Sequence, residues 1–263
     1  MSDIGLPREI APGIYWLSDC FVTPHPSIPG DFIHSYSSVY LVAGSDASLL
    51  VDTGHPKDYA AICEQLDRCH AKGAPPVKYI VPTHSEVPHA ANLASLLDRY
   101  PGSMVHGDIR DYHLIFPESV DRLVPMEIGD EIDLGTTTFV FVEAVVKDLV
   151  TSMWGYSTAQ RCLFPGDGFA YNHHHHQGEC GQTAEECPDL PVEEFTALFS
   201  EFALYWTRFT DMEDVLARLD AVLQVEYPVD LIAPAHGSPV LQPDVTFPRV
   251  KEGLLLGASI TNI

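Results

Sequence analysis

The sequence predicts an α/β or α+β fold with two central β-sheets and outer helices. Short apolar runs between turns alternate with segments of helical periodicity in the first half of the chain. A second strand-rich part then precedes a long helical region and one last strand. Although 263 residues exceed the usual length of one domain, no segment is long and polar enough to act as a linker. Residues 1–263 are therefore interpreted as a single domain.

The elements of the first half follow from local patterns. Strands are predicted at 13–17, 38–43, 47–51 and 77–81. Residues 21–31 contain three prolines and are expected to form a loop. Helices are predicted at 59–69 and 90–100, where apolar residues recur at helical spacing.

The second half begins with further short strands. They are predicted at 105, 123–126, 139–142, 161–165 and 231–233. A long helical region is expected at 192–225, with an interruption near 208–211.

The composition limits the classes of partner. The net charge is −23, with 14 Lys and Arg against 37 Asp and Glu, which disfavours nucleic acids and anionic membrane surfaces as partners. No apolar run reaches the roughly 18 residues that span a bilayer, and the N-terminus lacks the pattern of a secretory signal. We therefore expect a cytoplasmic protein with reduced cysteines. A disulfide or an adventitious metal site at Cys180 and Cys187 stays open.

The strongest local signal follows the predicted strand at 77–81. His84, Glu86 and His89 lie within six residues of one another, at a strand end where a rigid scaffold can hold them. Imidazole and carboxylate groups suit divalent transition metals. The alternative interpretation is an exposed polar loop.

Three weaker signals also follow predicted strands. Asp52 begins an Asp-Thr-Gly turn, Asp167 stands in Gly-Asp-Gly, and His236 precedes a glycine after the last strand. Each of these patterns alone is typical of a turn. Taken together, and in this order along the chain, they are more informative than any one of them alone.

That order resembles the metallo-β-lactamase superfamily, whose landmarks are a DTG turn, an HxHxDH loop, a later bridging Asp and a final His. The resemblance covers essentially the whole chain and implies a four-layer αββα sandwich. Glu86 makes the loop similar to the HxExDH loop of the flavodiiron branch. Residues 148–153 (DLVTSM) and 163–169 (LFPGDGF) resemble that branch's HWPDSM and LFSxDAF segments.

The resemblance implies a site for two divalent metal ions, zinc or iron, with manganese as a further option. His84 and Glu86 would bind one metal, His89 and His236 the other, and Asp167 would bridge both. Asp52 would orient the loop that carries His84.

Two positions depart from the flavodiiron pattern. Pro88 stands where that branch has an aspartate ligand, and Asp148 stands where it has a histidine ligand. Asp148 is expected to be a metal ligand, with a solvated loop acid as the alternative. Two divalent ions would be balanced by Glu86, Asp148, Asp167 and one bridging hydroxide, a nucleophile at neutral pH.

Other residues have candidate roles at the pocket. Asp167 is counted as catalytic because it would bridge the metals. In the superfamily the early loop flanks the pocket, so His34 and Tyr36 are expected to bind substrate or orient a leaving group, with packing as the alternative. The run His173–His176 is expected to be a mobile surface loop that collects metals, unless one member reaches the metal site or closes over substrate.

The favoured function is a metallohydrolase in which a metal-bridging hydroxide attacks a small ester, lactone or activated ether. An apolar pocket from Phe32, Tyr36, Trp154 and Phe169 would suit an aromatic substrate, similar in kind to that of a nitroaromatic ether demethylase. The alternative is a di-iron protein that binds or reduces dioxygen or nitric oxide. Its electron donor would be a separate protein, since no flavodoxin-like domain follows residue 263.

A third hypothesis is a non-enzymatic subunit or sensor that kept the fold and a partial site. The expected partners are a small-molecule substrate and either further copies of the chain or a related subunit. Neither nucleic acid nor membrane is expected as a partner.

Overall fold

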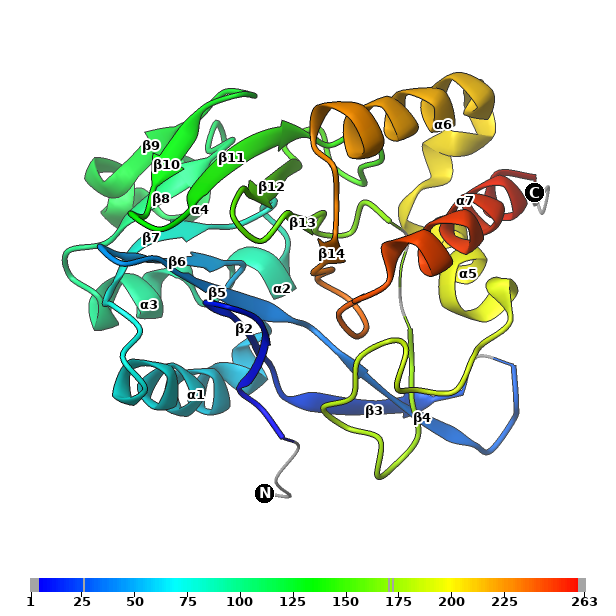
Figure 1. Cartoon of the computed structure of the whole chain (residues 1–263), viewed down its shortest axis with the longest axis horizontal. Helices are drawn as coiled ribbons and strands as arrows, with labels where there is room; N and C mark the ends of the chain where they lie inside the picture. Colours follow the sequence, from blue (N-terminus) through cyan, green and yellow to red (C-terminus); the bar gives the residue numbers. More distant parts are fainter. Residues whose placement is uncertain (1–4, 26, 170, 172, 260–263) are drawn as a thin grey trace.

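Two β-sheets lie face to face, and helices cover the outer side of each (Figure 1). The computed structural model describes residues 5–25, 27–169, 171 and 173–259. The larger sheet has seven strands in the spatial order β1 (Arg8–Ala11), β2 (Ile14–Leu17), β5 (Val39–Ala43), β6 (Ser48–Val51), β7 (Val77–Val81), β8 (Met104–Gly107) and β9 (Leu123–Pro125). The smaller sheet has the order β10 (Glu131–Asp133), β11 (Thr138–Glu143), β12 (Met153–Ser157), β13 (Cys162–Phe164) and β14 (Leu231–Ile232). A separate hairpin consists of β3 (Cys20–Pro24) and β4 (Phe32–Tyr36).

The α-helices fall into two groups along the chain. They are α1 (Tyr59–Ala71), α2 (Val87–Ala90), α3 (Leu93–Arg99), α4 (Tyr112–Ile115), α5 (Leu198–Ala203), α6 (Met212–Asp220) and α7 (Pro243–Ser259). Short 3₁₀ or π segments lie at Pro56–Asp58, Pro117–Arg122, Glu193–Ala197, Tyr205–Phe209 and Ala221–Glu226. Among the described residues, none of these helices combines the length and the apolar character needed to cross a bilayer.

Three apolar clusters separate the layers. One joins α1 and α3 to the outer face of the larger sheet, for example through Leu66 and Leu96. The second lies between the sheets and includes Trp16 and Phe141. The third joins the smaller sheet to the C-terminal helices and includes Leu254. Three interfaces between four layers confirm the predicted αββα sandwich.

The direction of the strands places the C-terminal ends of the parallel strands at one edge of each sheet. Strands β6, β7, β8 and β9 run parallel to one another in the larger sheet, and β13 and β14 run parallel in the smaller one. The loops that follow parallel strands emerge at the same edge of a sheet. The loops after β6, β7, β13 and β14 therefore bring chemistry-bearing residues together.

Two local expectations were wrong. Residues 21–31 do not form only a loop, because β3 continues to Pro24 and pairs with β4 through partners such as Val22 and His34. Pro24 ends β3 and Pro29 lies in the turn, where no ladder N–H is required. Helix α7 was not predicted at all, since Pro248 lies inside it and interrupts its sequence pattern.

Candidate metal centre

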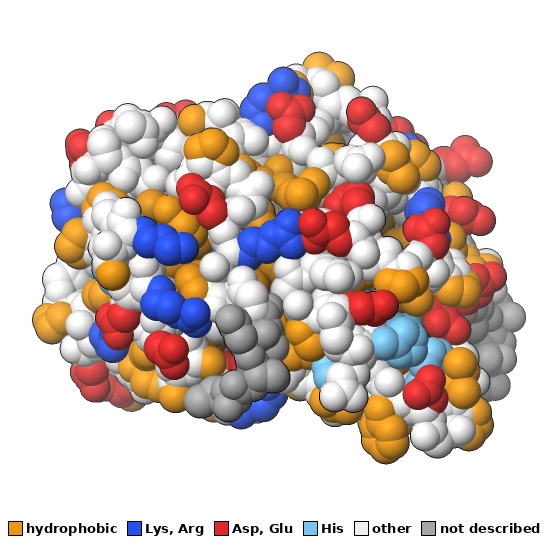
Figure 2. Space-filling view, turned by 60° about the horizontal axis from the view of Figure 1, so that its bottom comes forward, with side chains coloured by type: hydrophobic (Ala, Val, Ile, Leu, Met, Phe, Trp, Pro, Cys, Tyr) orange, Lys and Arg blue, Asp and Glu red, His pale blue; other side chains and the backbone are white. Residues whose placement is uncertain are grey.

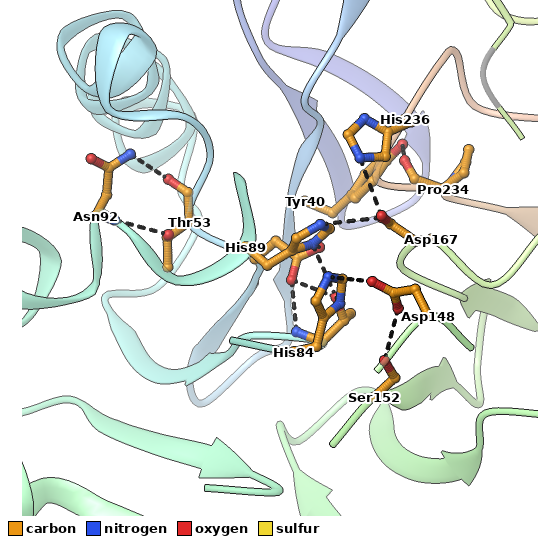
Figure 3. Close-up of polar contacts among 12 residues, drawn as sticks. Tyr40, Thr53, His84, His89, Asn92, Asp148, Ser152, Asp167, Pro234 and His236 are labelled. Carbon is orange, nitrogen blue, oxygen red and sulfur yellow. Dashed lines mark hydrogen bonds and ion pairs between the residues drawn. The ribbon is translucent and has the colours of Figure 1, made fainter. Parts of the chain in front are cut away.

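Six side chains converge where the two sheets meet, and all but Glu86 are labelled in Figure 3: His84, Glu86, His89, Asp148, Asp167 and His236. His84 follows β7, Asp167 follows β13 and His236 follows β14. Asp148 comes from the connection between β11 and β12. Each sheet thus contributes part of the pocket, and the packing of the sheets decides how the parts meet.

The ligand atoms form two groups that share His84. His84, His89 and Asp167 make one group, and His84, Glu86 and Asp148 make the other, with the offered atoms of each group within 4.8 Å of one another. Asp167 Oδ1 lies 3.1 Å from His89 Nε2 and 3.3 Å from His236 Nε2. This arrangement places Asp167 between two imidazoles, as its predicted bridging role requires.

Asp148 reaches the pocket from the opposite sheet. Its Oδ2 lies 3.3 Å from His84 Nε2, and its Oδ1 accepts a hydrogen bond of 3.0 Å from the Ser152 hydroxyl (Figure 3). Asp148 is therefore not the solvated loop acid of the alternative interpretation. Sequence reasoning gave no role to Ser152, which lies inside the recognised DLVTSM segment and holds the carboxylate in place.

Asp52 orients the loop that carries His84 and His89. One carboxylate oxygen accepts the Thr83 N–H at 2.7 Å and the Thr83 hydroxyl at 2.9 Å. The other lies 2.9 Å from His89 Nδ1. A proton on His89 Nδ1, shared with Asp52, leaves Nε2 free to face Asp167.

Gly166 allows the two sheets to approach beside Asp167. Its φ of +55° belongs to the left-handed region, and a Cβ there would lie 2.7 Å from Thr83 Oγ1. The Gly166 carbonyl also accepts the N–H of Ala235, which precedes His236. The close approach of Thr83 therefore explains why a glycine precedes Asp167, which a turn by itself does not explain.

The loop with His236 is held by strand β5 and the residues before it. The Ser38 N–H donates to the Ala235 carbonyl at 2.7 Å, and the Tyr40 hydroxyl donates to the Pro234 carbonyl at 2.9 Å (Figure 3). These contacts tie the smaller sheet's last loop to the larger sheet. They position His236 without contributing a ligand.

Buried polar atoms at this site lack hydrogen-bond partners. His84 Nε2, His89 Nε2 and Asp167 Oδ1 are buried, and none of them makes a hydrogen bond of acceptable geometry. His89 Nε2 and Asp167 Oδ1 are only 3.1 Å apart, but their angles do not suit a hydrogen bond, so the contact counts as an ion pair only. Because buried polar atoms are normally satisfied, three orphans facing one another fit a bound cation.

The pKa shifts here favour a neutral His84 and an ionised Asp167. Burial, and after it the neighbouring His89, lower the pKa of His84 to about 4. Burial also acts to lower the pKa of His89, but Asp52 and Asp167 raise it well above its ordinary value. Burial acts to raise the pKa of Asp167, yet His236 and His89 hold it well below its usual range.

Exposure differs across the HxExxH loop. His84 and His89 are buried, so they do not belong to the exposed polar loop of the alternative interpretation. Glu86 lies exposed at the edge of the pocket, and partial burial and the nearby Asp148 raise the pKa of its carboxyl. Pro88, which replaces a ligand of the flavodiiron pattern, lies at the start of α2.

Two residues assigned to catalysis lie elsewhere. His34 contacts Cys20 and Cys180 through its Nδ1. The Tyr36 hydroxyl accepts the Gly181 N–H at 2.6 Å, and its ring stacks on His175. His34 and Tyr36 stand two positions apart on β4 and so share one face, and their expected role in binding substrate or orienting a leaving group stays a prediction.

The expected aromatic pocket does not form. Phe32 is 57% exposed, whereas Trp154 and Phe169 stack on each other inside the apolar cluster beneath the C-terminal helices. The histidine run was also misjudged as a mobile surface loop. His173, His174 and His175 are buried.

Comparison with known proteins agrees with the site. The sequence profile of the metallo-beta-lactamase superfamily matches residues 34–236. An anaerobic nitric oxide reductase flavorubredoxin from Aliivibrio salmonicida is 30% identical over an alignment of 167 residues that covers 61% of this chain and 32% of that protein. A coenzyme F420H(2) oxidase from Methanocaldococcus jannaschii is 24% identical over 246 residues, covering 87% of this chain and 56% of the oxidase.

Solved structures show the same fold. The rubredoxin oxygen:oxidoreductase from Desulfovibrio gigas superposes with a TM-score of 0.72 at 16% identity, covering 94% of this chain and 60% of that one. The flavodiiron protein from Giardia intestinalis gives a TM-score of 0.71 at 16% identity, covering 95% of this chain and 59% of that one. This chain thus spans about a third of the flavorubredoxin and just over half of the oxidase.

These relatives correct the predicted function. They are named as a reductase and an oxidase, which contradicts the favoured hydrolase and supports the di-iron alternative. Ligand types alone misled the prediction because zinc hydrolases and iron oxidoreductases draw on the same imidazoles and carboxylates. From the profile match over most of its length and the convergence of strand-end ligands between two sheets, the chain belongs to the metallo-beta-lactamase superfamily.

Proposed function

We propose that this chain holds a dinuclear iron centre at which dioxygen or nitric oxide is reduced. The observation that carries the proposal is the convergence of three imidazoles and three carboxylates around buried, unpartnered atoms. An oxygen-rich set of this kind is hospitable to iron. The names of the similar proteins, a nitric oxide reductase, an oxidase and an oxygen:oxidoreductase, support the same class of chemistry.

The residues have distinct tasks in this proposal. Iron would supply the one-electron steps that the protein side chains cannot perform. His84, Glu86 and Asp148 would hold one ion, and His89 and His236 would hold the other. Asp167 lies between the two sides and would bridge them. Asp52 fixes the orientation of His89, so the pocket keeps its shape as charge changes within it.

Reduction requires an external electron source, which we propose to be a reduced flavin or an iron–sulfur protein. Four electrons and four protons convert one dioxygen to two waters. Two electrons and two protons convert two nitric oxide molecules to nitrous oxide and one water. The relatives' names, which refer to a flavin-containing rubredoxin and a rubredoxin, support these donor classes.

The test loads the protein with ferrous iron without oxygen and measures metal content and gas consumption with reduced flavin mononucleotide as donor. We expect about two irons at this centre and consumption of dioxygen, nitric oxide or both, well above the rate of the reduced flavin alone. Asp167→Asn is expected to lower the rate roughly a hundredfold. Asp98→Asn, a change of an exposed acid on α3, is the matched control.

Two outcomes would reject the proposal. Iron-loaded protein that consumes neither gas faster than the donor alone excludes the reduction. Zinc-loaded protein that is as active as the iron form excludes a redox role for the metal, because zinc has no accessible redox chemistry.

A further inference from the structure

A second group of potential ligands lies apart from the candidate metal centre. Cys20 and His34 belong to the β3–β4 hairpin, whereas His175 and Cys180 belong to the segment that follows Asp167. One ligand atom of each lies within 4.8 Å of the others. In Figure 2, histidine side chains gather over the part of the molecule where this hairpin lies in Figure 1.

Four of the six distances between these ligand atoms match the edges of one small tetrahedron, and the other two are within 4.8 Å. The two sulfur atoms are 3.6 Å apart. Cys20 Sγ lies 3.3 Å from His34 Nδ1 and 3.4 Å from His175 Nε2, and Cys180 Sγ lies 3.5 Å from His34 Nδ1. Zinc bonds of about 2.3 Å to sulfur and about 2.0–2.1 Å to nitrogen give tetrahedral edges of roughly 3.3–3.8 Å. A disulfide does not explain the pair, because bonded sulfurs lie about 2.05 Å apart.

The hairpin places its two ligands on one face. Cys20 pairs with Tyr36, and Val22 pairs with His34, so Cys20 and His34 are diagonal neighbours across the two strands. Side chains two positions apart in a strand point to the same face. The hairpin register therefore aims both ligand atoms at one point.

Backbone contacts bring the other two ligands to that point. His34 and His175 exchange N–H···O hydrogen bonds of 2.8 and 2.9 Å. Gly181, next to Cys180, donates its N–H to the Tyr36 hydroxyl and accepts a bond from Arg8 through its carbonyl. Arg8 is itself held by both carboxylate oxygens of Glu186. Separate contacts thus position each ligand before any ion is present.

We propose that Cys20, His34, His175 and Cys180 bind one zinc ion as a closed, structural site. Two thiolates and two imidazoles favour zinc, since such soft and borderline ligands in a tetrahedron are typical of it. All four positions are filled by protein, which leaves none for a substrate. The site does not depend on the iron centre or on its activity.

The zinc would join the β3–β4 hairpin to the segment at 173–180, which packs against the residue after His236. His173 lies in that segment, and its backbone nitrogen would be 2.6 Å from a Cβ added at Gly237. The same segment therefore packs directly against the residue after a candidate iron ligand. Holding its far end with zinc limits the movement of the His236 loop.

The first experiment is zinc analysis with X-ray absorption at the zinc edge on the full chain loaded with iron. We expect about one zinc per chain with two sulfur and two nitrogen ligands, at about 2.3 Å and 2.0–2.1 Å. The variant with Cys20→Ser and Cys180→Ser is expected to lose that zinc and keep its iron. Cys63→Ser and His113→Gln, which lie outside the group, are matched controls that should retain both metals.

Different ligand environments separate the outcomes. The neighbouring group of His25, His174 and Glu194 contains no sulfur, so zinc bound there would show only nitrogen and oxygen ligands. Such a spectrum would overturn the proposal. A wild-type protein without zinc would also overturn it, whether its thiols titrate as free or its mass shows a disulfide.

Cobalt substitution keeps the test decisive if the double variant does not fold. Wild-type protein refolded with cobalt should show a sulfur-to-cobalt charge-transfer band and the intense visible bands of tetrahedral coordination. Absence of both bands in protein that contains cobalt would refute a thiolate site. Neither readout requires the protein to reduce any gas, so failure of the proposed function would leave this result intact.

Discussion

Asp167 concentrates the chemistry of the candidate metal centre in one carboxylate. It is buried, lies between His89 and His236, and keeps an oxygen without a hydrogen-bond partner. Both contacts use the same oxygen, Oδ1. Its expected importance follows from that position.

Asp167→Ala is expected to lower bound metal below two per chain at this centre and to abolish activity. The change removes the shared oxygen and leaves His89 and His236 facing an apolar gap. Metal analysis after anaerobic loading measures the effect. Two metals retained at this centre would refute the bridging role.

Asp148→Ala should weaken mainly the metal held by His84 and Glu86. The carboxylate oxygen 3.3 Å from His84 Nε2 is lost, whereas the other side of the pocket is untouched. Ser152→Ala removes only the hydroxyl that holds Asp148 and should weaken metal binding by roughly tenfold. Titration calorimetry distinguishes the two. An unchanged affinity in Asp148→Ala would show that it is not a ligand.

At the scale of elements, the pocket depends on strand ends that must approach closely. Thr83 after β7 donates to Asp52, and its carbonyl accepts the N–H of Met153 at the start of β12. Gly166 after β13 packs against the same threonine. One residue thus connects the two sheets at the point where the ligands meet.

Gly166→Ala should destabilise the fold and disturb metal binding together. An alanine there has an unfavourable φ and a Cβ 2.7 Å from Thr83 Oγ1. Gly178 also has a positive φ of +97° but no heavy atom within 4 Å of an added Cβ, which makes it the matched control. We expect Gly178→Ala to cost about 1–2 kcal/mol and Gly166→Ala clearly more, by denaturant unfolding. Equal losses would mean that the contact with Thr83 has no weight.

At the scale of the whole molecule, three apolar interfaces stack two sheets between two layers of helices. Apolar side chains are nevertheless exposed on the C-terminal helices, where Phe202 is 78% and Phe209 73% exposed. Exposed apolar surface of this kind often marks contacts between proteins. That the chain forms an oligomer stays a prediction, and the surface around Phe202 and Phe209 is the candidate interface.

Sedimentation velocity tests the oligomer directly. We expect wild-type protein to sediment as a dimer or larger species at micromolar concentration, and Phe202→Ser with Phe209→Ser to shift it towards monomer. Leu114→Ser, which changes another exposed apolar residue on α4, is the control. A monomeric wild type would contradict the prediction for this chain alone.

The elements that could be predicted are those whose conformation depends mainly on residues that are close together in the sequence. The strand at 77–81 and the helix over α1 followed from residue type and spacing, and both were found where expected. Hairpin β3–β4 was missed because its pairing outweighs the local preference of three prolines. Helix α7 was missed because its apolar face is recognised only against the layer that it covers.

Ligand positions illustrate the same division. That His84, Asp167 and His236 follow strands can be predicted from sequence alone, because apolar runs and the residues after them are contiguous in the chain. Tertiary packing, in contrast, brings Asp148 to His84 and Cys20 to Cys180, which are 160 residues apart in sequence. Such contacts depend on how the sheets and loops pack against one another. The free energy of that packing comes from many contacts throughout the core, so no short stretch of sequence is enough to predict it.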